Sequence, residues 1–398
     1  MPIPDAAALR AYIQSHAADL RTYLLDLMRA RTVNPPGDEF RAAKILTDFC
    51  DRYGIPYRTF EKAPGRTNVV ATIGRGRPSV MVPCHFDTVP AGAGWETDPF
   101  DPVERDGRVI GRGSKDNKGP LAAMMLVARF LKEHEADLPG SLLLIGAADE
   151  EAGSALGMKY LLEECGIEAD AAIVPDSGYG MRLIDVGEKG VLFIKVKAYG
   201  RQAHGSEPDR GASALWPVID FLNHIRRWRP PSHPSDLFTP PTLNVGAIHA
   251  GSVANMVPAQ CEVLLDIRYL PGTDGEAIIE HFRRVLHEVE SMSGGVRMDL
   301  EVLSSQLPTL IAIDHPLVAL IERRTEEITG VRPERCGQSG ATVAKFLILR
   351  GTPAIGFTFG PQGAEHQAGE WIALDELTVF TEVMTRVILD IFTGGHTA

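Results

Sequence analysis

The sequence predicts an α/β protein with a mostly parallel sheet, interrupted by a smaller inserted α+β sandwich. Strand-like and helix-like segments alternate in the first and last parts of the chain, and the middle part follows the order β-α-β-β-α-β. The 398 residues also exceed one typical domain of about 100 to 200 residues, and the hydrophobic fraction of 44% can supply two cores. We therefore expect a first domain formed by residues 1–189 and 303–398, with a second domain inserted at 190–302.

The first part of the chain starts with helical spacing of apolar residues and continues with strands. Four apolar runs predict strands at 68–73, 79–84, 141–147 and 171–174. Between the second and third runs, Pro120 to Glu135 carries apolar residues at helical spacing. We expect this segment to be a crossover helix, the connection that parallel strands require.

The middle part of the chain has a different pattern of predicted elements. Alternating strand patterns and amphipathic helices are predicted, in chain order, at 191–198, 213–227, 242–248, 261–269, 274–289 and 296–302. This order describes an open-faced sandwich with its helices on one face. The α/β pattern then returns, with helices at 316–329 and 341–349, a buried strand at 353–359 and a last helix from Leu374. We expect these segments to complete the first sheet.

The net charge indicates which class of partner to expect, and the cysteines indicate the cellular compartment. The formal net charge is −12 and no stripe rich in Lys and Arg is present, which argues against a nucleic-acid partner. The five cysteines are scattered and include no Cys-x-x-Cys pair, as in reduced cytosolic proteins. We see no signal-peptide pattern and no run of about 18 apolar residues. The expectation is a cytoplasmic protein with a small-molecule partner and no membrane contact.

Metal-ligand residue types follow the predicted strands at several places. They are His85 and Asp87, Glu150 and Glu151, Asp176, His366, and Asp116 in a Gly-rich turn ahead of the crossover helix. In open α/β sheets, ligands bind outside the carboxyl ends of the strands. Carboxylates clustered there repel one another unless cations bridge them. We expect two divalent ions about 3.5 to 4 Å apart, with zinc as the first candidate and cobalt or manganese as alternatives.

Each of these signals has an ordinary structural reading when it is taken alone. A His-x-Asp pair is often only hydrogen-bonded, and two acids after a strand often form a solvated loop. Their shared position at one sheet edge favours the metal centre. Within it, Asp87 can hold the second ring nitrogen of His85. Of Glu150 and Glu151, one can bind metal while the other takes a proton from water.

These residues stand in segments that resemble a known family, the M20 metallopeptidases. The segments are Pro83–Pro90, Trp95–Phe100, Gly111–Gly119, Asp149–Glu151, Phe359 through His366, Gly200–Ser206, Asn255–Pro258 and Asp266–Arg268. They appear in the family's order over nearly the whole chain. The family includes acetylornithine deacetylase, succinyl-diaminopimelate desuccinylase, aminoacylase, carboxypeptidases and dinuclear dipeptidases.

The resemblance implies a role for each candidate ligand. Asp116 would bridge the two metal ions, Glu151 and His366 would complete one site, and His85 and Asp176 would complete the other.

It also implies roles for the residues around the metals. Glu150 would be the general base and Asp87 the supporting carboxylate, and the peptide bond between Asp116 and Asn117 would be cis.

In the inserted domain, the resemblance assigns substrate contacts. His204 would reach the active site of a partner subunit and stabilise the oxyanion, and Asn255 and Arg268 would grip the substrate carboxylate. Two simpler readings stay open, a loop histidine that caps its own turn and an internal salt bridge between Arg268 and Asp266. We expect a homodimer formed through the inserted domain, since the role of His204 requires a partner.

Two positions depart from the family pattern. Gly340 and Gly369 stand where many members carry an acid. Neither is a metal ligand, but the loop from Gly337 to Thr342 is expected to line the specificity pocket.

The expected function is dinuclear metal-dependent hydrolysis of an amide bond beside a free carboxylate, as in an N-acyl-amino-acid deacylase similar to acetylornithine deacetylase. A metallo-carboxypeptidase or a dipeptidase would use the same chemistry on a short peptide. A metabolite-binding protein without activity is a different class, but it would usually lose Glu150 or a ligand. A phosphate-binding nucleotide enzyme is disfavoured, because the glycine spacing from Gly111 to Lys115 fits neither known fingerprint.

Overall fold

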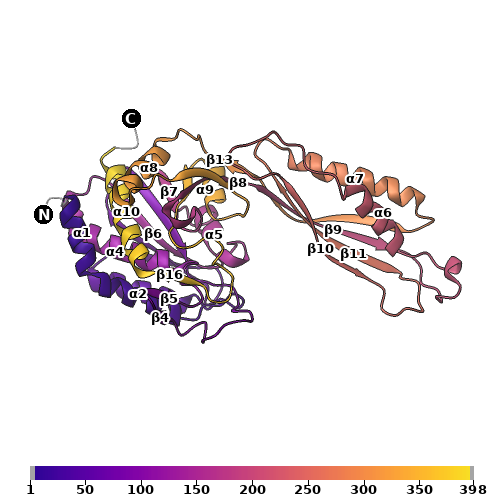
Figure 1. Cartoon of the computed structure of the whole chain (residues 1–398), viewed down its shortest axis with the longest axis horizontal. Helices are drawn as coiled ribbons and strands as arrows, with labels where there is room; N and C mark the ends of the chain where they lie inside the picture. The colour runs from indigo at the N-terminus through magenta and orange to yellow at the C-terminus, as the bar shows by residue number, and fades with distance from the viewer. Residues whose placement is uncertain (1–4, 395–398) are drawn as a thin grey trace. The chain divides into compact units, whose positions relative to one another are not determined.

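The computed structural model describes residues 5–394, which form two compact units (Figure 1). The first unit contains the chain up to Gly187, Leu310–Gln338 and the chain from Thr342 onward. The second unit contains Glu188–Thr309 and Ser339–Ala341. Compared with the predicted range of 190–302, the second unit starts earlier, at Glu188. It also ends later, because its last strand continues to Gln306.

The first unit is built on a nine-stranded sheet with the order β1-β2-β6-β3-β7-β15-β8-β13, and β14 pairs with β8. Its strands are β1 (Tyr57–Glu61), β2 (Thr67–Gly74), β3 (Ser79–His85), β6 (Ser141–Ala147), β7 (Ala171–Val174), β8 (Leu183–Glu188), β13 (Thr309–Leu310), β14 (Glu334–Gln338) and β15 (Ala354–Gly356). The four predicted strands at 68–73, 79–84, 141–147 and 171–174 are all present. The strand predicted at 353–359 is confirmed only over Ala354–Gly356.

Strand direction divides this sheet into a centre and two edges. The central neighbours β6, β3, β7 and β15 run parallel. By contrast, β2 runs antiparallel to both β1 and β6, and β8 runs antiparallel to β15. The prediction of a mostly parallel sheet therefore holds at the centre of a mixed sheet. The short link between β1 and β2 permits a hairpin, which is necessarily antiparallel.

Helices cover both faces of the central strands. They are α1 (Ala6–Ser15), α2 (Ala17–Arg29), α3 (Phe40–Tyr53), α4 (Lys118–Glu133), α5 (Met158–Glu163), α8 (Pro316–Thr329), α9 (Ala344–Leu349) and α10 (Leu374–Phe392). The crossover helix is α4, which contacts β2, β3 and β6 and is itself packed against α2 and α10. Helix α9 contacts β7 and β15. All seven residues of β3 are buried, as expected for a strand covered on both sides.

A small antiparallel sheet lies beside this arrangement. It consists of β4 (Val103–Arg105), β5 (Arg108–Ile110) and β16 (Trp371–Ala373), in the order β16-β5-β4. Because β5 leads into the Gly111–Asn117 loop and β16 follows Glu370, this sheet brings two distant parts of the chain together.

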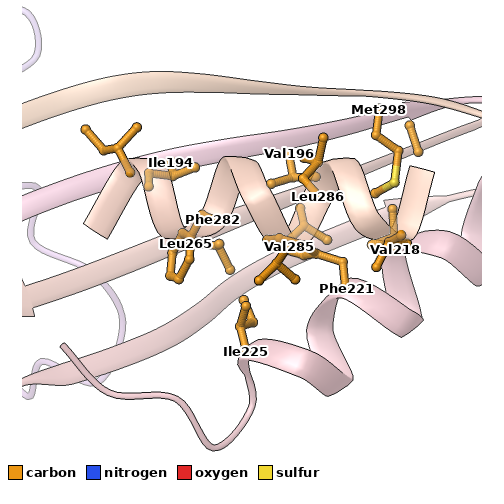
Figure 2. Close-up of a cluster of buried hydrophobic side chains, with 14 of the residues drawn as sticks. Ile194, Val196, Val218, Phe221, Ile225, Leu265, Phe282, Val285, Leu286 and Met298 are labelled. Carbon is orange, nitrogen blue, oxygen red and sulfur yellow. The ribbon is translucent and has the colours of Figure 1, made fainter. Parts of the chain in front are cut away.

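The second unit follows the predicted order β-α-β-β-α-β. Its elements are β9 (Gly190–Tyr199), α6 (Leu215–Ile225), β10 (Thr242–Ala250), β11 (Gln260–Tyr269), α7 (Gly275–Met292) and β12 (Arg297–Gln306). The sheet order is β10-β11-β9-β12, and all neighbouring strands are antiparallel. The inward side chains of β9 and β11 pack on α6 and α7 around Phe221 and Phe282, as Figure 2 shows.

Among residues 5–394, every helix is too short or too polar to cross a membrane. All five cysteines are free thiols.

Candidate metal centre

Strand ends deliver most of the candidate ligands to one edge of the central sheet. His85 is the last residue of β3, and Asp176 follows β7 by two residues. Glu150 and Glu151 lie in a single 3-10 turn, η2 (Glu150–Ala152), just after β6. Since β6, β3 and β7 are adjacent and parallel, their carboxyl ends meet at the same edge.

The five predicted metal ligands form two groups that share Asp116. One group contains His85, Asp116 and Asp176, and the other contains Asp116, Glu151 and His366. Within each group the ligand atoms all lie within 4.8 Å of one another. This arrangement is what a bridged pair of cations requires.

Distances show how Asp116 is shared. Its Oδ1 lies 2.9 Å from Nε2 of His85, and its Oδ2 lies 3.1 Å from Nε2 of His366. His366 Nε2 is also 3.1 Å from Oε2 of Glu151, while His85 Nε2 is 3.8 Å from Oδ1 of Asp176. One oxygen of a single carboxylate thus serves each group.

The local electric field favours positive charge at both groups. Hydrogen bonds to Asp116 and Glu151 raise the pKa of His366 to about 10. Burial works to lower the pKa of His85, yet the neighbouring carboxylates of Asp116, Asp176 and Asp87 raise it well above its ordinary value. Divalent cations bound to neutral imidazoles would supply that charge in place of protons. The imidazole and carboxylate donors suit zinc, manganese or cobalt, so the residues fit a pair of such ions.

The loop that carries Asp116 is held by a buried carboxylate, Glu370. Glu370 Oε1 accepts hydrogen bonds from the backbone N–H groups of Lys115 and Asp116, at 2.9 and 3.1 Å. Its Oε2 accepts from Nη1 of Arg112 and from the N–H of Gly113. The sequence patterns assigned no role to Glu370. Its function as an anchor depends on contacts between segments more than 250 positions apart in the chain.

The same loop turns directly into α4. The Asp116–Asn117 peptide bond is cis, as the family resemblance implied. A Cβ on Gly119 would lie 2.2 Å from the carbonyl oxygen of Ser114. Glycine is therefore required where the loop folds back against the first turn of the helix.

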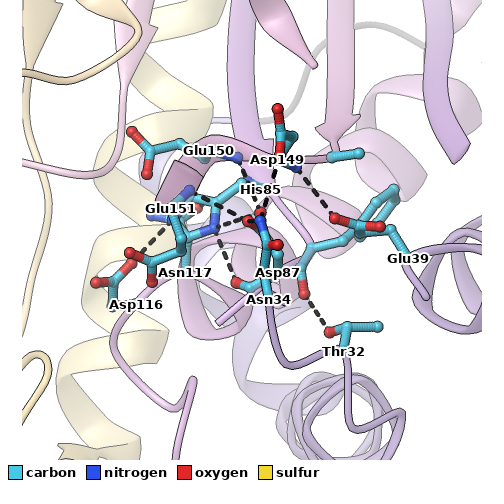
Figure 3. A network of polar contacts seen from close by, with 12 residues as sticks. Thr32, Asn34, Glu39, His85, Asp87, Asp116, Asn117, Asp149, Glu150 and Glu151 are labelled. Carbon is cyan, nitrogen blue, oxygen red and sulfur yellow. Dashed lines mark hydrogen bonds and ion pairs between the residues drawn. The ribbon is translucent and has the colours of Figure 1, made fainter. Parts of the chain in front are cut away.

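Asp87 differs in detail from its prediction. The nearest acceptor for Nδ1 of His85 is the backbone carbonyl of Asp87 at 3.0 Å, whereas the Asp87 carboxylate lies at 3.5 Å. That carboxylate accepts hydrogen bonds from the N–H groups of Glu150 and Glu151, each at 3.1 Å, and from Asn34 (Figure 3). Asp87 therefore orients His85 mainly through its backbone, and its carboxylate holds the turn that carries both glutamates.

A second layer of buried polar residues supports this turn. Glu39 is fully buried, pairs with Arg66 at 2.6 Å and accepts a hydrogen bond from the N–H of Asp149. Arg66 also reaches the Asp149 carboxylate at 3.0 Å. Asp149 itself adopts a left-handed backbone conformation, with φ of 65°. The acid before the two glutamates is thus a structural residue of the turn.

Glu150 belongs to neither ligand group. Burial raises the pKa of its carboxyl well above the usual value, and repulsion from Asp176 adds to this effect. Its neighbour Glu151 is the one of the two that joins a ligand group. The two adjacent acids therefore occupy different environments.

In the second unit, His204 and Asn255 lie together in an exposed region. The backbone N–H of Gly205 donates to the carbonyl of Asn255 at 2.8 Å, and an isolated β-bridge joins His204 to Met256. The His204 side chain is exposed, and its Nδ1 lies 2.7 Å from Oγ of Ser206. The simpler reading of a loop histidine that bonds its own turn describes this local geometry.

Arg268 lies at the far end of β11 from Asn255. It forms a bidentate ion pair with Asp266, with distances of 2.7 and 3.2 Å. The strand advances about 3.3 Å per residue, so the segment from Gln260 to Arg268 alone spans roughly 26 Å. Asn255 precedes the start of this strand and Arg268 lies near its end, and the joint grip of these residues on a substrate carboxylate stays a prediction.

Gly369 and Gly340, which stand where many family members carry an acid, lie in different parts of the structure. Gly369 has φ of 79° in the loop that carries His366, a conformation that favours glycine. Gly340 is in the segment Ser339–Ala341, which clusters with the second unit.

Comparison with known proteins finds a matching family, relatives and solved structures. Residues 81–390 match the model of peptidase family M20/M25/M40. The chain is 28% identical to an uncharacterised metallohydrolase of Methanocaldococcus jannaschii, over 91% of this chain and 97% of the relative. It is 30% identical to the acetylornithine deacetylase of Proteus mirabilis, over 84% of this chain and 85% of the relative. Among solved structures, a tripeptidase of Staphylococcus aureus has the same fold, with a TM-score of 0.79 and 22% identity over 95% of this chain and 99% of that one.

Proposed function

Because the chain belongs to peptidase family M20/M25/M40, whose members are metal-dependent hydrolases of amide or peptide bonds, we propose that it removes the acyl group from an N-acyl amino acid. The bond cleaved would be an amide next to a free carboxylate. Support for a deacylase comes from its 30% identity with an acetylornithine deacetylase over most of both chains.

One observation carries the proposal. Asp116 presents one oxygen to each of two ligand groups, at 2.9 Å from His85 and 3.1 Å from His366. Two divalent ions held there would supply Lewis-acid activation of water and of the amide carbonyl. We propose zinc as the native metal, since each group combines imidazole with carboxylate donors.

The chain's own residues would then move the proton and hold the geometry. Glu150 would accept a proton from the attacking water and pass it to the leaving amine. The Asp87 carboxylate would keep Glu150 in place, because it accepts a hydrogen bond from the backbone N–H of Glu150 at 3.1 Å.

Replacing Glu150 tests this assignment. We expect Glu150→Gln to lose about 10²- to 10⁴-fold in kcat and to keep the metal content of the unmodified protein, because Glu150 belongs to neither ligand group. Glu163→Gln, which neutralises an exposed acid of α5, is the matched control. Full activity of Glu150→Gln would exclude the residue as the base.

A substrate panel separates deacylase from peptidase. Acetylated, succinylated and formylated amino acids would be assayed beside dipeptides and tripeptides, because a tripeptidase shares the fold. We expect the acylated amino acids to be hydrolysed faster. Turnover of the peptides alone would assign the protein as a dipeptidase or carboxypeptidase instead.

We further propose that the active enzyme is a homodimer joined through the second unit. The edge strand β10 supports this, since its residues are largely exposed and include Val245 and Ile248. In such a dimer His204 and Asn255 would come from one subunit and Arg268 from the other, which would resolve their separation along β11.

Mixing two inactive variants tests the dimer. If Glu150→Gln and His204→Ala chains exchange subunits, half of the mixed dimers' sites would contain both intact residues, and activity would return. No recovery after demonstrated exchange would contradict a role for His204 in the partner's site.

The free cysteines lead us to propose a cytoplasmic location.

A further inference from the structure

The two histidines of the metal centre are held in very different ways. His85 ends the buried strand β3, and its side chain is only 3% exposed. His366 lies in the segment between β15 and β16, outside any helix or strand, with φ of 62° and a side chain that is 53% exposed. Gly360, Gly363 and Gly369 in this segment also have positive φ. Regular secondary structure therefore does not fix the His366 imidazole, and other contacts must do so.

One such contact precedes His366 directly. Oε2 of Glu365 lies 2.6 Å from Nζ of Lys115, the residue before the shared ligand Asp116. The Lys115 side chain is 4% exposed and that of Glu365 is 24% exposed. The Lys115 ammonium also lies 4.3 Å from the centre of the Tyr179 ring, a cation–π contact that restricts it further. An ion pair thus joins the neighbours of two ligands that are 250 positions apart.

A second contact follows His366. Glu370 accepts hydrogen bonds from the backbone of Gly113, Lys115 and Asp116. The His366 segment is therefore fastened to the Asp116 loop on both sides of the histidine. Glu370 binds the backbone of that loop and the Arg112 guanidinium, whereas Glu365 pairs with the Lys115 ammonium.

We propose that Lys115 and Glu365 are positioning residues for the half of the metal centre formed by Asp116, Glu151 and His366. The inference rests on the proposed two-metal function. The other half shares Asp116, but its remaining ligands, His85 and Asp176, are placed by strand ends without this pair. Partners behind the ligands of a metal site typically change metal affinity by about 10- to 100-fold when they are removed. The effect should fall on one ion of the two.

The variant Lys115→Met distinguishes positioning from simple charge. Removing a positive charge near a cation site should strengthen metal binding if only electrostatics mattered. Loss of positioning should weaken it. The expected sign is therefore opposite in the two cases.

The experiment is a zinc titration of metal-free protein with a competing chelator. We expect two ions in the unmodified protein. In Lys115→Met, one ion should bind as before, and the affinity for the other should fall about 10- to 100-fold. Lys62→Met is the matched control, because it breaks an exposed Lys–Glu pair of 2.5 Å with Glu164. Glu365→Gln should repeat the loss, and the double variant should be no worse than either single one, since the two residues act as a unit.

The outcomes separate the inference from the proposed function. Equal or tighter binding of both ions by Lys115→Met, or an equal loss at both, would overturn the positioning role. Should Lys115→Met fail to fold, Lys115→Gln decides by the same criteria, because it also removes the positive charge and the ion pair with Glu365. An unmodified protein that binds no pair of ions would instead remove the proposed function.

Discussion

In the first unit the candidate ligands are held by buried carboxylates, whereas in the second unit His204 and Asn255 lie in an exposed loop. Asp87, Glu370 and Glu39 are almost fully buried, and each anchors backbone next to the metal centre. The His204 ring has its hydrogen-bonding partner in its own turn.

The candidate ligands of the first unit are therefore arranged before substrate binds. The arrangement of His204 and Asn255 depends on contacts outside their exposed loop. A carboxylate that accepts several buried N–H groups costs too much to displace, so the first centre is rigid. An exposed loop pays no such cost when it moves.

Removing the charge of Glu370 should have the largest effect on stability. Glu370→Gln leaves the buried guanidinium of Arg112 without its ion partner, and breaking a buried pair costs about 3 to 5 kcal/mol. Urea unfolding measures this change. Asp48→Asn, which breaks the exposed pair with Lys44, should cost at most about 1 kcal/mol. Similar costs for both variants would show that the first centre is not held by burial.

Removing the imidazole of His204 should affect turnover and leave stability unchanged. We expect His204→Ala to lower kcat by about 10²- to 10³-fold, the usual loss for one oxyanion donor. Its free energy of unfolding should change by less than about 0.5 kcal/mol, because the side chain is exposed. Steady-state kinetics and urea unfolding give both values, with His224→Ala as an exposed control. Unchanged kcat would support the reading of a loop histidine that only caps its turn.

Chelation of the metal ions should destabilise the first unit alone. An ion present at 100 times its Kd contributes about 2.7 kcal/mol to the folded state. After chelation, the rate of backbone hydrogen exchange, measured by mass spectrometry, should therefore rise in peptides of β3, β6 and β7. It should stay unchanged in peptides of β9 and β11. Equal changes in both units would mean that the ligand groups do not hold the ions.

A smaller effect is expected from pH in the second unit. The His281 ring stacks on Trp228 at 4.7 Å, and burial, with help from Arg284, lowers the pKa of His281. A histidine with a lowered folded-state pKa contributes stability that is present above its unfolded pKa of about 6.5 and is lost as pH falls through the folded value.

The melting temperature should accordingly fall less between pH 7 and pH 5 in His281→Gln than in the unmodified protein. His287→Gln, an exposed position on the same helix, should show the full decrease. If His281→Gln and the unmodified protein decline equally, His281 does not contribute to the acid sensitivity.

The sequence alone determined the elements whose pattern is local. Apolar runs specified the central strands and the order of the second unit, and the polar residues at the ends of those strands included His85, Glu151 and Asp176. This worked because parallel strands end at a common edge, so that position along the chain translates into position in space. The other two members of the ligand groups, Asp116 and His366, lie in loops farther from a strand end.

Tertiary structure alone decided the residues that support this edge and those that lie far from it. The anchoring by Glu370, the pair of Lys115 with Glu365 and the hold of the Asp87 carboxylate on the glutamate turn each join distant segments. The antiparallel edge strands likewise emerged only from strand pairing. Local periodicity carries no information about which remote segment a buried charge will meet, because packing of the whole chain selects that partner.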